Sequence, residues 1–154
     1  MPVFEGSHTI PRGRFAIVAS KFNHPVVERL VAGAQNALRQ RGIAEDAADI
    51  AWVPGSFEIP LIAQKLASSK KYDAVICLGA VIRGETDHYD YVCAAAADGV
   101  LQAGLATGVP ILFGVLTCDT DEQALERAGG KFGNKGFDVA LAALEMANLI
   151  KQLP

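Results

Sequence analysis

The sequence has few aromatic residues and few cysteines, and each shortage excludes a class of protein. Aromatic side chains make up 7% of the 154 residues and hydrophobic side chains 51%. The core must therefore consist of Val, Ile, Leu and Ala, which favours α/β packing over an aromatic-rich β-sandwich. The three cysteines, Cys77, Cys93 and Cys118, form no C-x-x-C motif. They are typical of reduced thiols in a cytoplasmic protein rather than of a disulfide framework.

Blocks of like charge and long apolar runs are also missing. The formal net charge is −3 with both signs interspersed, so no basic patch predicts binding to nucleic acid or to an anionic membrane. The longest apolar run, 74–82, is much shorter than the roughly 20 residues that a membrane-spanning helix requires. Residues 1–5 lack the basic start and the apolar stretch of a signal peptide. We therefore expect one soluble, cytoplasmic domain over residues 1–154.

Strand-like and helix-like segments alternate along the chain. The apolar spacing, with breaks at Pro and Gly, predicts strands at 14–20, 50–53, 74–82 and 111–116, and helices at 25–42, 57–68, 88–106, 120–127 and 134–152. Successive β-α units imply a parallel sheet with helices on both faces and right-handed crossovers. Residues 1–12 fit none of these units, and we predict that they form a tail or a strand that pairs with a neighbouring subunit.

The segment after the third predicted strand combines residue types that suit an anion-binding loop. In open α/β sheets, ligands bind at the carboxyl ends of the strands, where this segment lies. Gly84 lets backbone N–H groups approach an anion, Thr86 adds a hydroxyl, and His88 can carry a proton near neutral pH. The segment also fits a capped helix start with a surface histidine, and on its own it leaves both interpretations open.

Two other strand ends carry unusual residues. Phe22, in the turn before Pro25, suits stacking on a flat ring, although a single loop phenylalanine also fits a packing role. The turn at 54–56 offers free N–H groups, and Glu58 can accept hydrogen bonds from sugar-like hydroxyls. Taken alone, this turn also fits an ordinary helix entry.

A second dense segment, 127–136, places four glycines and three cations between two predicted helices. Such a loop could close on a phosphate. It is not a Walker A loop, and no G-x-G-x-x-G follows a strand, so nucleotide hydrolysis and dinucleotide redox chemistry are not indicated. His8, His24 and His88 have no zinc-like spacing, so we predict no metal.

Together these motifs resemble the lumazine synthases, the 6,7-dimethyl-8-ribityllumazine synthases of riboflavin biosynthesis. The resemblance extends from about residue 15 to the last helix and is carried by Phe22-Asn23, 53–60, 79–88 and 126–136. It implies a flavodoxin-like, three-layer α/β/α sandwich on a four-stranded parallel sheet. That fold agrees with the one predicted from periodicity.

The resemblance also implies a reaction, the penultimate step of riboflavin biosynthesis. In this step 5-amino-6-(D-ribitylamino)uracil condenses with 3,4-dihydroxy-2-butanone 4-phosphate, and water and inorganic phosphate are released. No cofactor is implied, because the substrate's own amine attacks the ketone. The residues implied are His88 as proton carrier; Phe22, Asn23, Ser56, Phe57, Glu58, Val81, Ile82, Phe113 and Lys135 for substrate; and Gly84, Glu85, Thr86 and Arg127 for phosphate.

In this family the pocket lies between adjacent subunits of a pentamer, with Phe113, Arg127 and Lys135 contributed across the interface. Some members assemble further into icosahedral capsids, and the short loop at 129–136 leads us to expect a capsid here. Whether a riboflavin synthase partner is enclosed stays open, as does the role of Asp138, where other members carry Glu. Glu85 and Asp87 would repel the phosphate, so we expect both side chains to point away from it.

Two interpretations from other classes remain. A non-catalytic flavin- or lumazine-binding protein would keep Phe22 and the phosphate loop but would not need His88, Arg127 and Lys135 together. A capsid-forming shell protein would keep its interfaces but would tolerate a damaged pocket. The presence of all three residues favours the enzyme.

Overall fold

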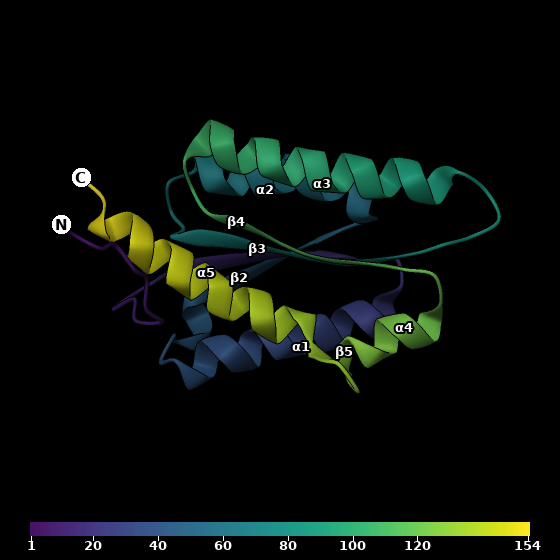
Figure 1. Ribbon diagram of the computed structural model, residues 1–154, viewed down its shortest axis with the longest axis horizontal. Helices are drawn as coiled ribbons and strands as arrows, with labels where there is room; N and C mark the ends of the chain where they lie inside the picture. The colour runs from purple at the N-terminus through teal and green to yellow at the C-terminus, as the bar shows by residue number, and fades with distance from the viewer.

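The computed structural model describes all 154 residues and has three layers (Figure 1). The strands are β1 (Phe15–Ser20), β2 (Ala48–Val53), β3 (Ala74–Ile82) and β4 (Ile111–Cys118), and the main helices are α1 (His24–Gln40), α2 (Ile59–Ser68), α3 (His88–Thr107), α4 (Asp121–Glu126) and α5 (Lys135–Gln152). The strands pair in parallel in the order β2-β1-β3-β4. The predicted fold class is confirmed.

Each face of the sheet has its own apolar core, because successive strand residues point to opposite faces. Phe15 and Ile17 of β1 belong to the core beneath α1 and α5. Ala16 and Val18 belong to the core beneath α2 and α3. In Figure 1, α2 and α3 cover one face and α1, α4 and α5 cover the other. Both cores are mainly aliphatic, and each fully buried Val, Leu or Ile stabilises the fold by about 1.5–3 kcal/mol.

Some element boundaries differ from the prediction. Strand β2 begins at Ala48, two residues before the predicted start, because its first residues pair with the start of β1. Strand β4 continues to Cys118, which pairs with Ile82 of β3. The predicted helix at 57–68 begins as a 3-10 turn, Ser56–Glu58, before α2. A small hairpin of β5 (Ala128–Gly130) and β6 (Gly133–Asn134) lies within the predicted loop.

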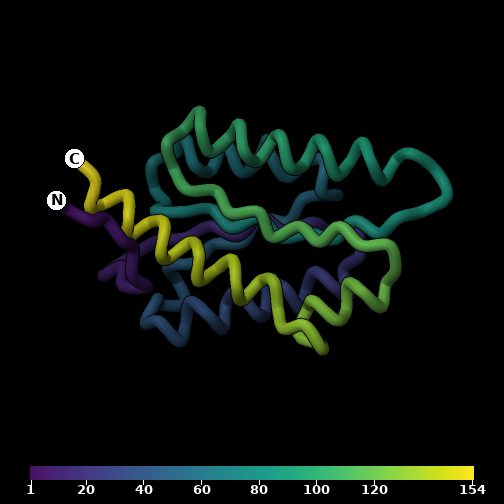
Figure 2. The backbone as a smooth tube through the Cα atoms, viewed as in Figure 1, coloured from purple at the N-terminus to yellow at the C-terminus, as the bar shows by residue number.

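The N-terminal segment is not a strand of this sheet but lies along the last turns of α5. The backbone N–H of Ser7 donates to Oδ1 of Asn148 at 2.9 Å, and Nδ2 of Asn148 donates to the carbonyl of Thr9 at 2.8 Å. Ile10 is buried in the core. The two chain ends lie at the same side of the molecule (Figure 2). Pairing of this segment with a neighbouring subunit stays a prediction.

The cysteines agree with the prediction from composition, since all three are free. Burial raises the pKa of Cys77 to about 12, so this thiol stays protonated and unreactive at neutral pH. None of the helices combines the length and the hydropathy needed to cross a bilayer.

Candidate active site

The carboxyl ends of the strands, here called the carboxyl edge, carry a cavity of about 670 Å³. Loops after β1, β2 and β3 and the first turns of α3 form its walls. Parallel strands end together, so segments that lie far apart in the sequence meet there. The predicted site residues that line this first cavity are Phe22, Ser56, Phe57, Glu58, Val81, Ile82, Gly84, Thr86 and His88.

Two phenylalanines stand exposed at this cavity. Phe22 is 71% exposed and Phe57 is 59% exposed. The backbone N–H of Phe22 donates to the carbonyl of Pro54 at 3.1 Å, so the loops after β1 and β2 are joined. Exposed aromatic rings on a fixed backbone suit the face of a flat ligand.

Asn23 fixes the loop after β1 rather than lining the cavity. Its backbone is left-handed, with φ 59° and ψ 41°, a conformation that Asn tolerates better than most residues. Its side-chain Nδ2 donates to the carbonyl of Ala80 at 2.8 Å. The amide is thus used to hold this loop against β3, and the predicted substrate contact of Asn23 stays a prediction.

The loop between β3 and α3 leaves donors free for an anion. The space where a side chain of Gly84 would project is empty to 4 Å. Helix α3 begins at His88 without a side-chain cap from Asp87, so N–H groups of its first turn lack helical partners. Thr86 Oγ1 lies 3.4 Å from the backbone N of His88, a long contact. The arrangement suits a phosphate at the N-terminus of a 20-residue helix.

The two carboxylates of this loop lie outside the lining of the first cavity. Glu85 and Asp87 are exposed, and neither lines the cavity. They do not pair with the nearby Arg83, whose guanidinium contacts Asp119 and Asp90 instead. An anion in the cavity would therefore not face these two carboxylates.

The remaining predicted residues lie elsewhere in the chain. Phe113, Arg127 and Lys135 line a second cavity of about 600 Å³, formed by β4, α4, the β5–β6 hairpin and the start of α5. The linings of the two cavities share no residue. Asp138 lines the second cavity too, so its carboxylate belongs to the same wall as both cations. One chain thus separates the predicted site into two parts.

The position of Arg127 is set by its own helix and hairpin. Its Nη1 donates to the carbonyl of Gln123 at 3.0 Å, and its guanidinium carbon lies 4.8 Å from the ring centre of Phe132. The backbone N–H of Lys135 donates to the carbonyl of Arg127 at 2.8 Å. Two cations are therefore held on neighbouring backbone, which suits an anion.

Sequence reasoning missed two residues at the carboxyl edge, Ser20 and Tyr89, whereas Ser56 was predicted. Ser20 is fully buried, Ser56 is 5% exposed, and neither Oγ has a hydrogen-bond partner. A side chain at Gly79 would meet both hydroxyls within 3.0 Å, so glycine makes room for them. Tyr89 also lines the cavity, and burial raises its pKa. A serine ending an apolar strand, and a tyrosine next to His88, were the available signals.

Nowhere do three His, Cys, Asp or Glu side chains gather in a way that could hold a metal ion. The family model described as 6,7-dimethyl-8-ribityllumazine synthase matches residues 12–151 of the chain. The match includes the whole sheet, both cavities and every predicted site residue.

Proposed function

The chain belongs to the lumazine synthase family, whose enzymes catalyse the penultimate step of riboflavin biosynthesis, and from this premise we propose how its residues divide the work. The first cavity binds 5-amino-6-(D-ribitylamino)uracil and the phosphate of 3,4-dihydroxy-2-butanone 4-phosphate. The second cavity, from an adjacent copy, completes the site. The observation that carries the proposal is the gathering of predicted residues from three separate loops around one cavity.

The pyrimidine stacks on Phe22, whose exposed ring supports this role. The polar edges of the pyrimidine form hydrogen bonds with the unpartnered hydroxyl and the backbone of Ser56 and with the backbone of Val81 and Ile82. Glu58 accepts hydrogen bonds from the ribityl hydroxyls. A buried hydroxyl without a partner is unfavourable, and a ligand that supplies the partner removes that penalty.

The phosphate lies at the loop of Gly84, Glu85 and Thr86. The open space beside Gly84 and the uncapped start of α3 support this placement. Arg127 and Lys135 of the adjacent copy add positive charge as phosphate leaves. Donors that are already in position stabilise the departing dianion without reorganisation.

His88 moves the protons. The substrate amine attacks the ketone, water and phosphate leave, and the ring closes, so no enzyme nucleophile is needed and the chain must orient two substrates. His88 lines the first cavity, next to the proposed phosphate site. A positioned histidine of this kind contributes roughly 10²–10⁴-fold to the rate.

A second copy is required because one chain holds only part of the site. Exposed apolar side chains on α2 and α3 support close contact between copies, among them Leu61, Tyr91, Leu101 and Leu105. Joining unlike surfaces repeatedly closes a ring when the rotation allows it. We propose a pentamer, and from the short hairpin an icosahedral assembly of pentamers that could enclose a riboflavin synthase. Sedimentation that gives only pentamers would refute the capsid.

The three free thiols support a cytoplasmic setting.

To test the activity, the purified oligomer is mixed with both substrates, and the fluorescent lumazine is followed against the uncatalysed background. We expect acceleration that is lost in His88→Ala and Arg127→Ala. A flavin- or lumazine-binding protein would instead bind ligand without turnover, and a shell protein would do neither.

A further inference from the structure

Arg83 directly precedes the proposed phosphate loop, but its guanidinium contacts side chains outside that loop. Its Nε donates to Oδ1 of Asp119 at 2.8 Å, and its Nη1 lies 3.8 Å from Oδ1 of Asp90. Its guanidinium carbon lies 4.3 Å from the ring centre of Tyr89. The side chain thus contacts the end of β4 and the first turn of α3 at once.

The backbone of Arg83 is also anchored. Its N–H donates to the carbonyl of Cys118 at 2.8 Å, which continues the β3–β4 pairing by one residue. The next residue is Gly84, whose backbone is free of side-chain restraint and faces open space. The loop therefore leaves the sheet directly after a residue that is held by both its backbone and its side chain.

We propose that Arg83 is a positioning residue of the phosphate site and does not itself bind the phosphate. By joining the end of β4 to the start of α3, it fixes the N–H groups of residues 84–88 so that they converge on one anion. The guanidinium already faces the carboxylates of Asp119 and Asp90, which partly neutralise the charge that it could offer to a phosphate. Binding groups held in advance bind more tightly than groups that must be ordered.

Asp119, which holds Arg83, is itself fixed through its backbone to the turn that holds Arg127. The backbone N–H of Asp119 donates to Oε1 of Gln123 at 2.8 Å, and the Gln123 carbonyl accepts from Arg127 at 3.0 Å. Thr120 Oγ1 caps the same turn by accepting from the Gln123 N–H at 3.2 Å. One network therefore connects the phosphate loop of the first cavity to the cation of the second.

The Arg83–Asp119 pair lies at the surface, so its loss should affect phosphate binding more than the stability of the fold. The Arg83 and Asp119 side chains are 49% and 65% exposed, and such pairs add little to the free energy of unfolding. A matched pair exists at the opposite end of the sheet. Arg14 is also 49% exposed and lies 3.5 Å from Asp49.

The test uses the assembled enzyme and inorganic phosphate as the probe. Arg83→Ala and Asp119→Ala should each raise the Kd of phosphate and the KM of the butanone phosphate roughly tenfold, the size expected for losing a charge-assisted contact. The KM of the pyrimidine should change less than about twofold. The double variant should be no worse than either single variant, because the two residues act as one unit.

Conservative changes sharpen the result. Arg83→Lys should not restore phosphate binding, because lysine lacks the planar fork and the stacking surface. Asp119→Asn keeps an acceptor and provides a second variant if Asp119→Ala assembles poorly. Arg14→Ala, the matched control, should leave phosphate binding unchanged.

The sign of the Asp119 effect decides between positioning and direct binding. If Arg83 bound the phosphate itself, removing Asp119 would free the guanidinium and tighten phosphate binding, and this result would overturn the proposal. Unchanged binding in both variants would overturn it too. The inference rests on the proposed phosphate loop, which Thr86→Ala tests separately. If Thr86→Ala leaves phosphate binding unchanged, the proposed phosphate loop is wrong. If Thr86→Ala weakens phosphate binding but Arg83→Ala does not, only the positioning role of Arg83 is wrong.

Discussion

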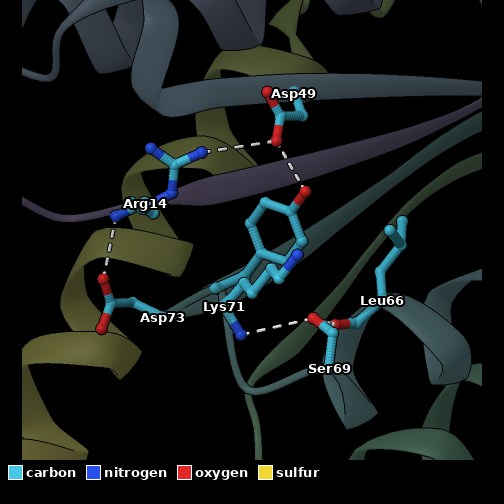
Figure 3. Close-up of polar contacts among 7 residues, drawn as sticks. Arg14, Asp49, Leu66, Ser69, Lys71 and Asp73 are labelled. Carbon is cyan, nitrogen blue, oxygen red and sulfur yellow. Dashed lines mark hydrogen bonds and ion pairs between the residues drawn. The ribbon is translucent and has the colours of Figure 1, made fainter.

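The two ends of the sheet differ in the polar groups that they leave without hydrogen-bond partners. At the amino edge, where the strands begin, Arg14 lies 3.5 Å from Asp49, and its backbone N–H donates to Asp73 at 2.9 Å (Figure 3). Tyr72 donates to Asp49 at 2.6 Å. At the carboxyl edge, the hydroxyls of Ser20 and Ser56 have no partner and α3 begins without a side-chain cap.

This difference separates stability from function. The paired polar groups of the amino edge hold the strand starts and the end of α5 in place. A buried hydroxyl without a partner destabilises the free protein, and a ligand that supplies a partner would remove that cost. Substitutions at the amino edge should therefore change the free energy of unfolding and not turnover, and substitutions at the carboxyl edge should do the reverse.

The largest effect is expected at His88. His88→Ala should lower kcat by roughly 10²–10⁴-fold, because the positioned proton carrier is lost. The side chain is exposed, so the melting temperature should hardly move. His24→Ala is the matched control, since His24 also begins a helix, and its side chain contacts Glu28 at 3.2 Å and the Trp52 ring, with 5.1 Å between ring centres. Equal rates for both variants in the lumazine assay would remove the catalytic role of His88.

Phe22 comes next. Phe22→Ala should raise the KM of the pyrimidine substrate about tenfold, since stacking of a base on an aromatic ring contributes ~1–3 kcal/mol. Because the ring is 71% exposed, the free energy of unfolding should change by less than about 0.5 kcal/mol. Steady-state kinetics with each substrate varied in turn will locate the effect. A change confined to the butanone phosphate would contradict the stacking role.

At the amino edge, Asp73→Ala should lower stability by about 1–3 kcal/mol and leave the activity of the folded enzyme unchanged. The change removes the acceptor for the Arg14 N–H and the ion pair with Lys151 at 3.2 Å. Calorimetry should show a lower melting temperature. Asp46→Ala, at an exposed turn before β2, serves as the control with little expected change. Lost turnover in Asp73→Ala at unchanged stability would contradict the proposal that the amino edge serves stability and the carboxyl edge serves function.

The smallest effect concerns Tyr72 and depends on pH. The hydrogen bond to Asp49 is the main cause that raises the pKa of Tyr72, with burial second. A raised folded pKa means that the stabilisation is fully present below the unfolded pKa of about 10 and is lost as the pH rises through the folded value. Tyr72→Phe should lower stability by about 1 kcal/mol at pH 7, and the gap should close at strongly alkaline pH. A gap that stays constant across this range in urea unfolding would contradict this origin.

Much of the fold could be predicted because local patterns and tertiary packing agree. The apolar spacing between Pro25 and Gly42 predicted α1 to within about two residues, and α4 lies within the helix predicted at 120–127, with Thr120 as its N-cap. The end of β4 could not be predicted, because Cys118 is in a strand only through its pairing with Ile82. The β5–β6 hairpin lies in a glycine-rich stretch with too little periodicity to show a strand.

The order of strands and helices predicts the candidate site only where neighbouring strand ends bring motifs together, and the separate contribution of Phe113, Arg127 and Lys135 was predicted from the family resemblance. The β-α order places the loops of Phe22, Ser56 and Gly84 at one edge. It cannot show that Arg127 lies in a different cavity, since that depends on how α4 and the hairpin pack. The Arg83–Asp119 bond spans 36 residues and exists only once β3 and β4 pair.

We propose that the carboxyl edge of one chain holds half a site and that a second copy supplies the other half. His88→Ala chains keep an intact second cavity, and Arg127→Ala chains keep an intact first cavity. Co-expressed with different tags and purified as mixed assemblies, the two inactive variants should regain about a quarter of wild-type activity, because that share of the interfaces joins two intact halves. Mixed assemblies that contain both chains and stay as inactive as either variant alone would contradict a site shared between two copies.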